Sequence, residues 1–394
     1  MTGAVRPLTV AIDVRCLSAT RHDGIVRYTR EIAAALAAQP GLRVVAIGRE
    51  GASGLPVGIV AVGGRRELTW EQVALPRALA RIGADVLLSP ANRGLPLVRP
   101  CPAVLVLHDV AEWDRSVVPA FSGSAALRFS YANVVSLATA TLILTGSRSS
   151  DDEIRARLGI GPGRIRVALY GVGEELRRDP GEAAIAGVRH RLGITSRTAL
   201  HVGSLAARKD VPTLLRAVAR VDPAVLEALV CVGGSEADIA EARRLAEALG
   251  VSPRVRFAGP VDDGDLPAVY RAAGCLVSAA THEGFGLPVA EAMAAGLPVV
   301  AARAGALPEV VAGGGLLFRP GDHAEAAMLI ERVLSSGEER ARLASAGRER
   351  AGALTWDRAA RETAAVLREA VALGRTTRFA RGVASLRALP RWVR

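Results

Sequence analysis

One lysine stands apart among the basic residues of this 394-residue sequence. Of the 50 lysines and arginines, Lys209 is the single lysine, in the segment Gly203-Ser-Leu-Ala-Ala-Arg208-Lys209-Asp210. The segment follows an apolar, strand-like run and precedes a helix expected to begin near Val211. Arginine offers a fork of donors and lysine a point charge, so adjacent cations at a strand end are suited to neutralise a diphosphate. The alternative is a pair of solvated surface cations.

A second segment with chemical potential runs from Glu283 to Val300, after a strand-like run that ends at Ser278. Gly284 and Gly286 precede a helix expected near Pro288, because proline suits the first turn of a helix. Unbonded amides and the positive end of a helix dipole together favour an anion. The segment therefore predicts a site for a phosphate or for sugar hydroxyls.

Glu283 and Glu291 in this segment are candidates for a pair of catalytic carboxylates. Eight residues of continuous helix span about 12 Å, whereas glycosidase carboxylates lie roughly 5–9.5 Å apart. Separate binding roles fit better: we expect Glu291 in the first helical turn, where it can accept from a ribose diol, and Glu283 in the loop, where it can reach a sugar. The alternatives are a first-turn acid stabilised by the dipole alone and a solvated loop acid.

The first half of the chain offers weaker candidates. His108 closes a strand-like run, where a histidine that faces a cleft could bind a sugar hydroxyl or help a proton leave; a structural histidine is the alternative. Gly24, between the first strand and the first helix, would let a phosphate approach the backbone, although a simple turn explains it equally well.

The elements that position these residues follow the pattern of parallel sheets covered by helices, because short β-branched runs alternate with Ala/Leu/Arg-rich helical stretches. Many of the runs end in glycine or a small polar residue, where open parallel sheets bind ligands. The expected strands are Leu8–Val14, Arg43–Ile47, Gly58–Val62, Asp85–Ser89, Ala103–His108, Thr141–Thr145, Ile165–Leu169, Ala199–Val202, Leu229–Val232, Val255–Ala258, Cys275–Ser278, Pro298–Ala301 and Leu316–Phe318.

We predict two Rossmann-like domains, because the alternation breaks in a Gly-, Glu- and Arg-rich stretch near the middle. The first covers 1–175 and the second, which carries the candidate phosphate residues, covers 190–355. A C-terminal helix, 356–374, ends the second domain or crosses back to the first. A basic tail, 375–394, follows.

Composition limits the location and the partners. No uncharged apolar run approaches the roughly 20 residues of a spanning helix, the N-terminus lacks a signal peptide, and the four cysteines are scattered, so we expect a cytoplasmic protein. The net charge of +11 raises nucleic acid as a partner, but the tail holds six arginines and no acid, and only 4% of residues are aromatic. We therefore expect no nucleic-acid binding.

Together, Glu283–Val300, the Arg208-Lys209 loop and His108-Asp109 resemble the retaining glycosyltransferases of family 4 (group 1). These have the GT-B fold, with two Rossmann-like domains whose parallel sheets face each other across a cleft. The resemblance covers most of the chain. Trp70-Glu71-Gln72 with Leu75-Pro76 further resembles the branch that includes many polysaccharide and O-antigen mannosyltransferases.

This resemblance implies a role for each candidate. Arg208 and Lys209 would bind the donor diphosphate, with Gly24 and Gly203 close to it, and Glu291 would bind the ribose. Glu283 would bind the donor sugar, and His108 would lie at its reacting face. The amides that contribute to the sugar site are those of Phe285, Gly286 and Leu287.

The implied reaction is retaining transfer of a hexose or deoxyhexose, without metal or cofactor, to a glycan, lipid-linked or small-molecule acceptor. The favoured donor is GDP-mannose.

One departure from the family pattern is Val26, where relatives often have glycine, which puts the phosphate contact of the first domain in doubt. The alternative enzyme, a sugar-nucleotide epimerase or hydrolase, needs a close carboxylate pair that the sequence does not offer. Arginines and apolar residues interleave in the tail roughly as in a basic amphipathic segment, which suggests peripheral contact with an anionic membrane. The alternative is a solvated tail.

Overall fold

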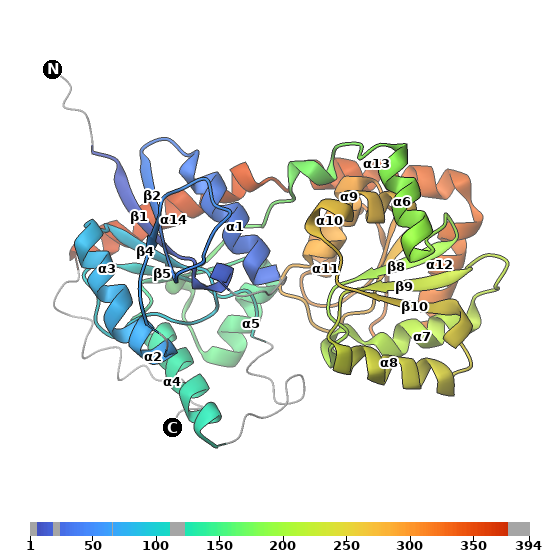
Figure 1. Cartoon of the computed structure of the whole chain (residues 1–394), viewed down its shortest axis with the longest axis horizontal. Coiled ribbons are helices and arrows are strands. Elements are labelled where there is room, and N and C mark those ends of the chain that lie inside the picture. The colour runs from blue at the N-terminus through green and yellow to red at the C-terminus, as the bar shows by residue number, and fades with distance from the viewer. Residues whose placement is uncertain (1–5, 19–23, 65, 111–122, 377–394) are drawn as a thin grey trace. The chain divides into compact units, whose positions relative to one another are not determined.

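The structure is a computed structural model that describes residues 6–18, 24–64, 66–110 and 123–376. The chain forms two compact units (Figure 1). Unit 1 comprises Met1–Gly171 and Trp356–Arg394, and unit 2 comprises Val172–Thr355. Each unit is a parallel β-sheet between layers of helices, which confirms the expected α/β class.

Unit 1 contains a seven-stranded sheet with the order β3-β2-β1-β4-β5-β6-β7. Its strands are β1 (Leu8–Asp13), β2 (Leu42–Gly48), β3 (Ile59–Ala61), β4 (Val86–Ser89), β5 (Ala103–Val106), β6 (Leu142–Thr145) and β7 (Ile165–Val167). Its helices are α1 (Gly24–Ala37), α2 (Glu67–Thr69), the π-helical turn η2 (Trp70–Ala74), α3 (Leu75–Ile82), α4 (Gly123–Thr139), α5 (Arg148–Leu158) and α14 (Trp356–Thr376), with short 3-10 turns η1 (Arg15–Ser18) and η4 (Pro162–Arg164).

Helices cover both faces of this sheet. Residues of α3, α4 and α5, such as Leu79, Leu137 and Ile154, share one buried cluster with strand residues such as Leu87 and Leu105. Figure 1 shows α1 and α14 on the other face, where α14 contacts α1, β4, β5 and β6. Because both faces are covered, the strands read as continuous apolar runs.

Unit 2 contains a six-stranded sheet with the order β10-β9-β8-β11-β12-β13. Its strands are β8 (Thr198–Val202), β9 (Ala228–Val232), β10 (Val255–Gly259), β11 (Cys275–Ser278), β12 (Val299–Ala302) and β13 (Leu316–Phe318). Its helices are α6 (Glu182–Leu192), α7 (Val211–Arg220), α8 (Glu236–Ala248), α9 (Leu266–Ala272), α10 (Leu287–Ala295), α11 (Leu307–Val311), α12 (His323–Ser335) and α13 (Gly337–Gly352), with 3-10 turns η5 (Glu174–Leu176), η6 (Ala207–Lys209), η7 (Ser252–Arg254) and η8 (Asp263–Asp265).

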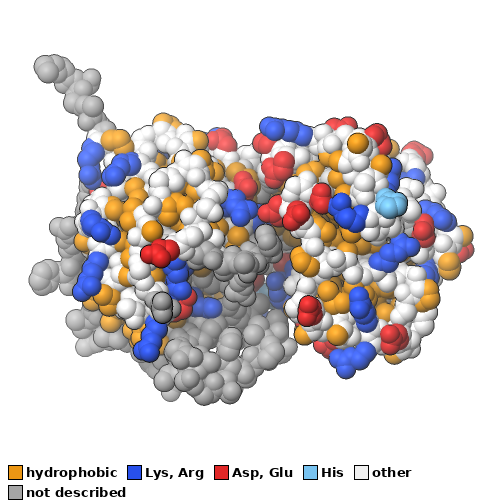
Figure 2. Space-filling view, in the orientation of Figure 1, with side chains coloured by type: hydrophobic (Ala, Val, Ile, Leu, Met, Phe, Trp, Pro, Cys, Tyr) orange, Lys and Arg blue, Asp and Glu red, His pale blue; other side chains and the backbone are white. Residues whose placement is uncertain are grey.

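The helices of unit 2 also form two layers. α7 contacts α8 and α12 on one face of the sheet, and α10 contacts α9 and α13 on the other. Figure 1 shows α7 and α8 on the opposite side of β8–β10 from α9 and α10. Figure 2 shows basic and acidic side chains interspersed over the visible face of this unit.

All thirteen expected strands are present, within two residues of the predicted bounds at nearly every end. In each sheet the strand order reverses once, between β1 and β4 in unit 1 and between β8 and β11 in unit 2. Open parallel sheets bind their ligands beyond the carboxyl ends of the strands at such a reversal. None of the described helices is long and apolar enough to cross a bilayer. Of the basic tail, residues 377–394 lie outside the described residues.

Candidate functional site

The reversal in unit 2 brings two candidate segments together. The loop after β8 carries Arg208 and Lys209, and the loop after β11 carries Glu283. The amide of Thr281 donates to the carbonyl of Arg208 over 2.9 Å, which joins the two loops through their backbones. The structure therefore brings Arg208, Lys209 and Glu283 together beyond the carboxyl ends of β8 and β11.

A tight turn orients the side chains of Arg208 and Lys209. Arg208 and Lys209 lie in the 3-10 turn η6, and Asp210 follows with a φ of 47°, a left-handed conformation that costs a non-glycine residue free energy. The Asp210 carboxylate accepts from the Thr213 hydroxyl over 2.7 Å, and it caps α7 by accepting from the Thr213 amide over 3.3 Å. This capping bond offsets the strain and fixes where η6 ends.

Glu283 forms ion pairs with both cations. Nη1 of Arg208 lies 3.3 Å from Oε2 of Glu283, and Nζ of Lys209 pairs with Oε1. The side chains of Lys209 and Glu283 are only 8% and 11% exposed. Burial alone would raise the pKa of Glu283, but the charges of Lys209 and Arg208 outweigh it and hold the pKa below its ordinary value. Glu283 is therefore an anion at neutral pH.

Both loops carry a glycine with a positive φ, a backbone conformation that side chains disfavour. Gly203 has a φ of 132° and no described atom within 4 Å of the position that a Cβ would occupy. Gly286, with a φ of 91°, lies immediately before α10, where a Cβ would come within 2.6 Å of Leu307. Leu287 begins α10, and the first amides of a helix have no carbonyl partner inside it. Phe285 is buried beside them.

The position of Glu291 corrects the sequence prediction. α10 begins at Leu287, so Glu291 is its fifth residue and lies in the second turn rather than the first. Its side chain is buried, and Oε2 accepts a hydrogen bond from the buried Tyr270 hydroxyl over 2.7 Å. The helix dipole stabilises acids mainly in the first turn of a helix, so it does not account for a buried glutamate in the second turn.

His108 belongs to unit 1, and both of its ring nitrogens have partners there. Nε2 lies 2.7 Å from the Pro90 carbonyl oxygen, and Nδ1 lies 2.7 Å from the Tyr170 hydroxyl. A carbonyl can only accept, so Nε2 carries a hydrogen, and Nδ1 of the neutral ring accepts from Tyr170. Tyr28 packs edge-on against the ring at 5.0 Å between centroids. The geometry fixes the His108 ring through both of its nitrogens.

The second candidate of unit 1, Gly24, is the first residue of α1, and the loop before it, 19–23, lies outside the described residues. Val26, the departure from the related pattern, is buried in the same helix. Val26 thus has a packing role, and the structure adds no contact that would assign Gly24 to a phosphate.

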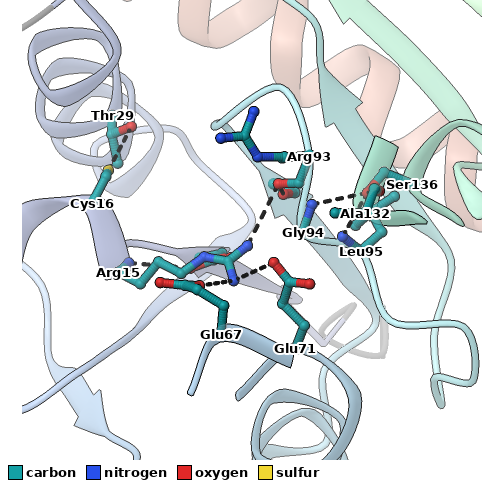
Figure 3. Close-up of polar contacts among 12 residues, drawn as sticks. Arg15, Cys16, Thr29, Glu67, Glu71, Arg93, Gly94, Leu95, Ala132 and Ser136 are labelled. Carbon is teal, nitrogen blue, oxygen red and sulfur yellow. Dashed lines mark hydrogen bonds and ion pairs between the residues drawn. The ribbon is translucent and has the colours of Figure 1, made fainter. Parts of the chain in front are cut away.

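Sequence reasoning missed a charge cluster around the largely buried Arg15 at the β1/β4 reversal of unit 1 (Figure 3). Nη2 of Arg15 lies 3.1 Å from Asp13, and Nη1 lies 2.8 Å from Glu71 and 3.1 Å from Glu67. The guanidinium also lies 4.8 Å from the ring centroid of Trp70. We call these five residues the Arg15 cluster.

The Arg15 cluster gives a physical reason for the Trp70-Glu71 pair. Glu71 is an ion-pair partner of Arg15, and Trp70 is a surface on which the guanidinium lies. Burial raises the pKa of both Asp13 and Glu71, against the opposing charge of Arg15. An arginine two residues after a buried strand-end aspartate was the available sequence signal.

His201 is another residue that sequence reasoning missed. It lies in β8, 2% exposed, and Nε2 donates to the Ser204 carbonyl over 3.2 Å at the start of the loop that carries Lys209. Burial lowers the pKa of His201, so the ring is neutral at pH 7. Only its position near a strand end could have drawn attention to it.

Residues 189–350 match the model of the family described as glycosyl transferases group 1. The chain is 29% identical over 354 residues to D-inositol 3-phosphate glycosyltransferase 1 of Catenulispora acidiphila, with 82% of each chain covered. It is 34% identical over 258 residues to D-inositol 3-phosphate glycosyltransferase of Salinispora tropica, which covers 61% of this chain and 53% of that relative. The chain thus spans about half the length of most of the curated relatives it matches.

Solved structures share the whole fold. Anabaena HepE in complex with UDP and glucose has a TM-score of 0.72 at 22% identity, covering 92% of this chain and all of that one. WaaG, a glycosyltransferase involved in lipopolysaccharide biosynthesis, has a TM-score of 0.68 at 19% identity and covers 91% of this chain and 99% of its own. These similarities establish the two-unit GT-B fold.

Proposed function

We propose that the chain is a group 1 glycosyltransferase, the family whose model matches residues 189–350, and that it transfers a hexose or deoxyhexose from a nucleoside-diphosphate sugar to an acceptor hydroxyl. The observation that carries the proposal is the convergence of Arg208, Lys209 and Glu283 at the strand-order reversal of unit 2. Two adjacent cations beside glycine-lined backbone and a helix start form an anion site of the kind that a diphosphate requires.

The geometry suggests how the protein would lower the barrier. As the bond between the sugar C1 and the diphosphate oxygen breaks, negative charge grows on the diphosphate. Arg208 and Lys209 are already fixed by η6, so they stabilise that charge without reorganising. Because these cations take the place of a divalent metal, we propose a metal-independent reaction. Glu291, held by Tyr270, is proposed to accept from the ribose.

Stereochemistry and the role of His108 follow from the family resemblance. We propose retention at the anomeric carbon and contact between His108 and the reacting face of the sugar. Nε2 of His108 donates to the Pro90 carbonyl in this structure, so we propose that it exchanges this acceptor for a sugar oxygen when it contacts the sugar. Proton magnetic resonance of the initial product, which separates the two anomers, tests retention directly.

The donor and the acceptor are open to direct assay. The Trp70-Glu71-Gln72 pattern favours GDP-mannose, whereas HepE was solved with UDP, and the curated relatives are named for D-inositol 3-phosphate. The proposal is that GDP-mannose is the donor and that a glycan or a lipid-linked or small-molecule hydroxyl is the acceptor.

A thermal-shift screen against nucleoside diphosphates tests the donor site. A ligand at 100 times its Kd stabilises the folded state by about 2.7 kcal/mol. Unit 2 contains no tryptophan, so unfolding is followed by circular dichroism. We expect one nucleotide to raise the melting temperature, and the matching nucleotide sugar to be consumed only when an acceptor is present. Consumption without an acceptor would instead indicate a hydrolase.

Two further proposals concern location. All four cysteines are free, as suits work in the reducing cytoplasm. The six arginines of 375–394 are proposed to hold the protein at an anionic membrane surface. Flotation with vesicles that contain phosphatidylserine should decrease when 375–394 is deleted, and equal flotation of both forms would remove this proposal.

A further inference from the structure

The Glu283 carboxylate occupies the position where an anionic ligand of unit 2 would be held. It contacts Nζ of Lys209 through one oxygen and lies 3.3 Å from Nη1 of Arg208 through the other. A single carboxylate therefore bridges the same two cations that would bind a diphosphate. One of the two positive charges of this site is therefore compensated from within the chain.

The backbone of Glu283 is fixed, so only its side chain can move when another anion binds Arg208 and Lys209. The Glu283 carbonyl accepts from the Ala306 amide over 2.9 Å, and the adjacent Gly305 leaves no room for a Cβ against the same backbone. Glu283 has rotatable side-chain bonds beyond this anchor. Its carboxylate can therefore leave the cations while the loop stays in place.

Two anions cannot share these cations without repelling each other. Like charges a few ångströms apart in a partly buried site repel strongly, because the effective dielectric constant there is far below that of water. A diphosphate that binds Arg208 and Lys209 must displace the Glu283 carboxylate or bind beside it at a loss of affinity. When the sugar hydroxyls are present they offer the displaced carboxylate other partners.

We propose that Glu283 is an internal competitor for the diphosphate site, which returns to Arg208 and Lys209 after transfer and promotes release of the nucleoside diphosphate. This inference rests on the proposed function and adds a role to the same site. Once the sugar has left, its hydroxyls no longer hold the carboxylate. The cations are then its nearest partners, so the product is bound more weakly than the cations alone would bind it.

Glu283→Gln tests the competition, because the amide is of similar size and carries no charge. With the nucleoside diphosphate that gives the largest thermal shift, isothermal titration calorimetry should show about tenfold tighter binding, equivalent to about 1.4 kcal/mol. Turnover should fall, because the sugar loses a partner, and inhibition by the product should become stronger. The matched control is Glu247→Gln, an exposed acid on α8, which should bind like the unaltered protein.

Glu283→Asp provides a second variant if the amide impairs folding. It keeps the charge but shortens the side chain, so the carboxylate is drawn back from the cations and binding of the product should tighten by less than tenfold. Binding that is unchanged or weaker in both folded variants would overturn the inference. Failure of the unaltered chain to bind any nucleoside diphosphate would instead refute the proposed function, and the competition with it.

Discussion

Replacement of Arg15 by methionine should destabilise unit 1 strongly. The side chain of Arg15 is 10% exposed, and its partners Asp13 and Glu71 are 1% and 8% exposed. Removing one member of a buried ion pair leaves an uncompensated charge and costs about 3–5 kcal/mol. At roughly 2–4 °C per kcal/mol for a unit of 150–250 residues, the melting temperature should fall by roughly 6–20 °C.

The loss of stability in Arg15→Met should increase with pH. Burial already raises the pKa of Asp13 and Glu71, and Arg15 opposes that rise. Without Arg15 both values rise further, so the folded protein binds protons more tightly than the unfolded chain. The stabilisation that this tighter proton binding gives the folded protein is fully present below the ordinary carboxyl pKa. It is lost as the pH rises through the raised pKa values of Asp13 and Glu71. Arg15→Met should therefore be more destabilised at pH 8 than at pH 5.

Tryptophan fluorescence is the suitable assay, because all tryptophans of the sequence fall within unit 1 and none within unit 2. Arg6→Met is the matched control: Arg6 is 70% exposed and pairs with Asp85, and such surface pairs contribute at most about 1 kcal/mol. Arg15→Met combined with Glu71→Gln should recover part of the loss. A melting temperature within about 2 °C of the unaltered protein, or an equal deficit at both pH values, would refute the reasoning.

Three further predictions concern unit 2. Lys209→Ala and Glu291→Ala should each cost about 2–4 kcal/mol of transition-state stabilisation, measured as kcat/KM, and near-native turnover would contradict their roles. Gly286→Ala should destabilise the protein by about 1–3 kcal/mol in thermal unfolding, because its φ is 91° and the new Cβ would meet Leu307; an unchanged melting temperature would count against this geometry. Tyr270→Phe should cost about 1.5–3 kcal/mol of stability, since it removes a hydrogen bond to a buried carboxylate, and an unshifted urea midpoint would argue against that bond.

The strands could be predicted from the sequence because both faces of each sheet are covered. A strand buried on both faces must be apolar at every position, so runs such as Leu229–Val232 stand out from the amphipathic helices around them. The convergence of Lys209 and Glu283 was also predictable, because the carboxyl ends of parallel strands meet at one edge.

The partners of these residues could not be read from the sequence. The hydrogen bond between Tyr270 and Glu291 depends on how α9 packs on α10. Because α10 begins one residue earlier than predicted, Glu291 lies in the second turn and not in the first. The ion pairs of Glu283 with Arg208 and Lys209 depend on the path of the loop, which the spacing of the residues does not encode. The Arg15 cluster joins residues that lie 52 to 56 positions apart.

The central claim is that unit 2 binds a nucleoside diphosphate through Arg208 and Lys209. Calorimetric titration of the full chain and of Lys209→Ala tests it most directly, with Arg244→Ala, an exposed arginine on α8, as the control. We predict one nucleotide bound per chain, affinity weakened by about 30-fold or more in Lys209→Ala, and no change in Arg244→Ala. Equal binding by all three proteins, or by none, would contradict the account.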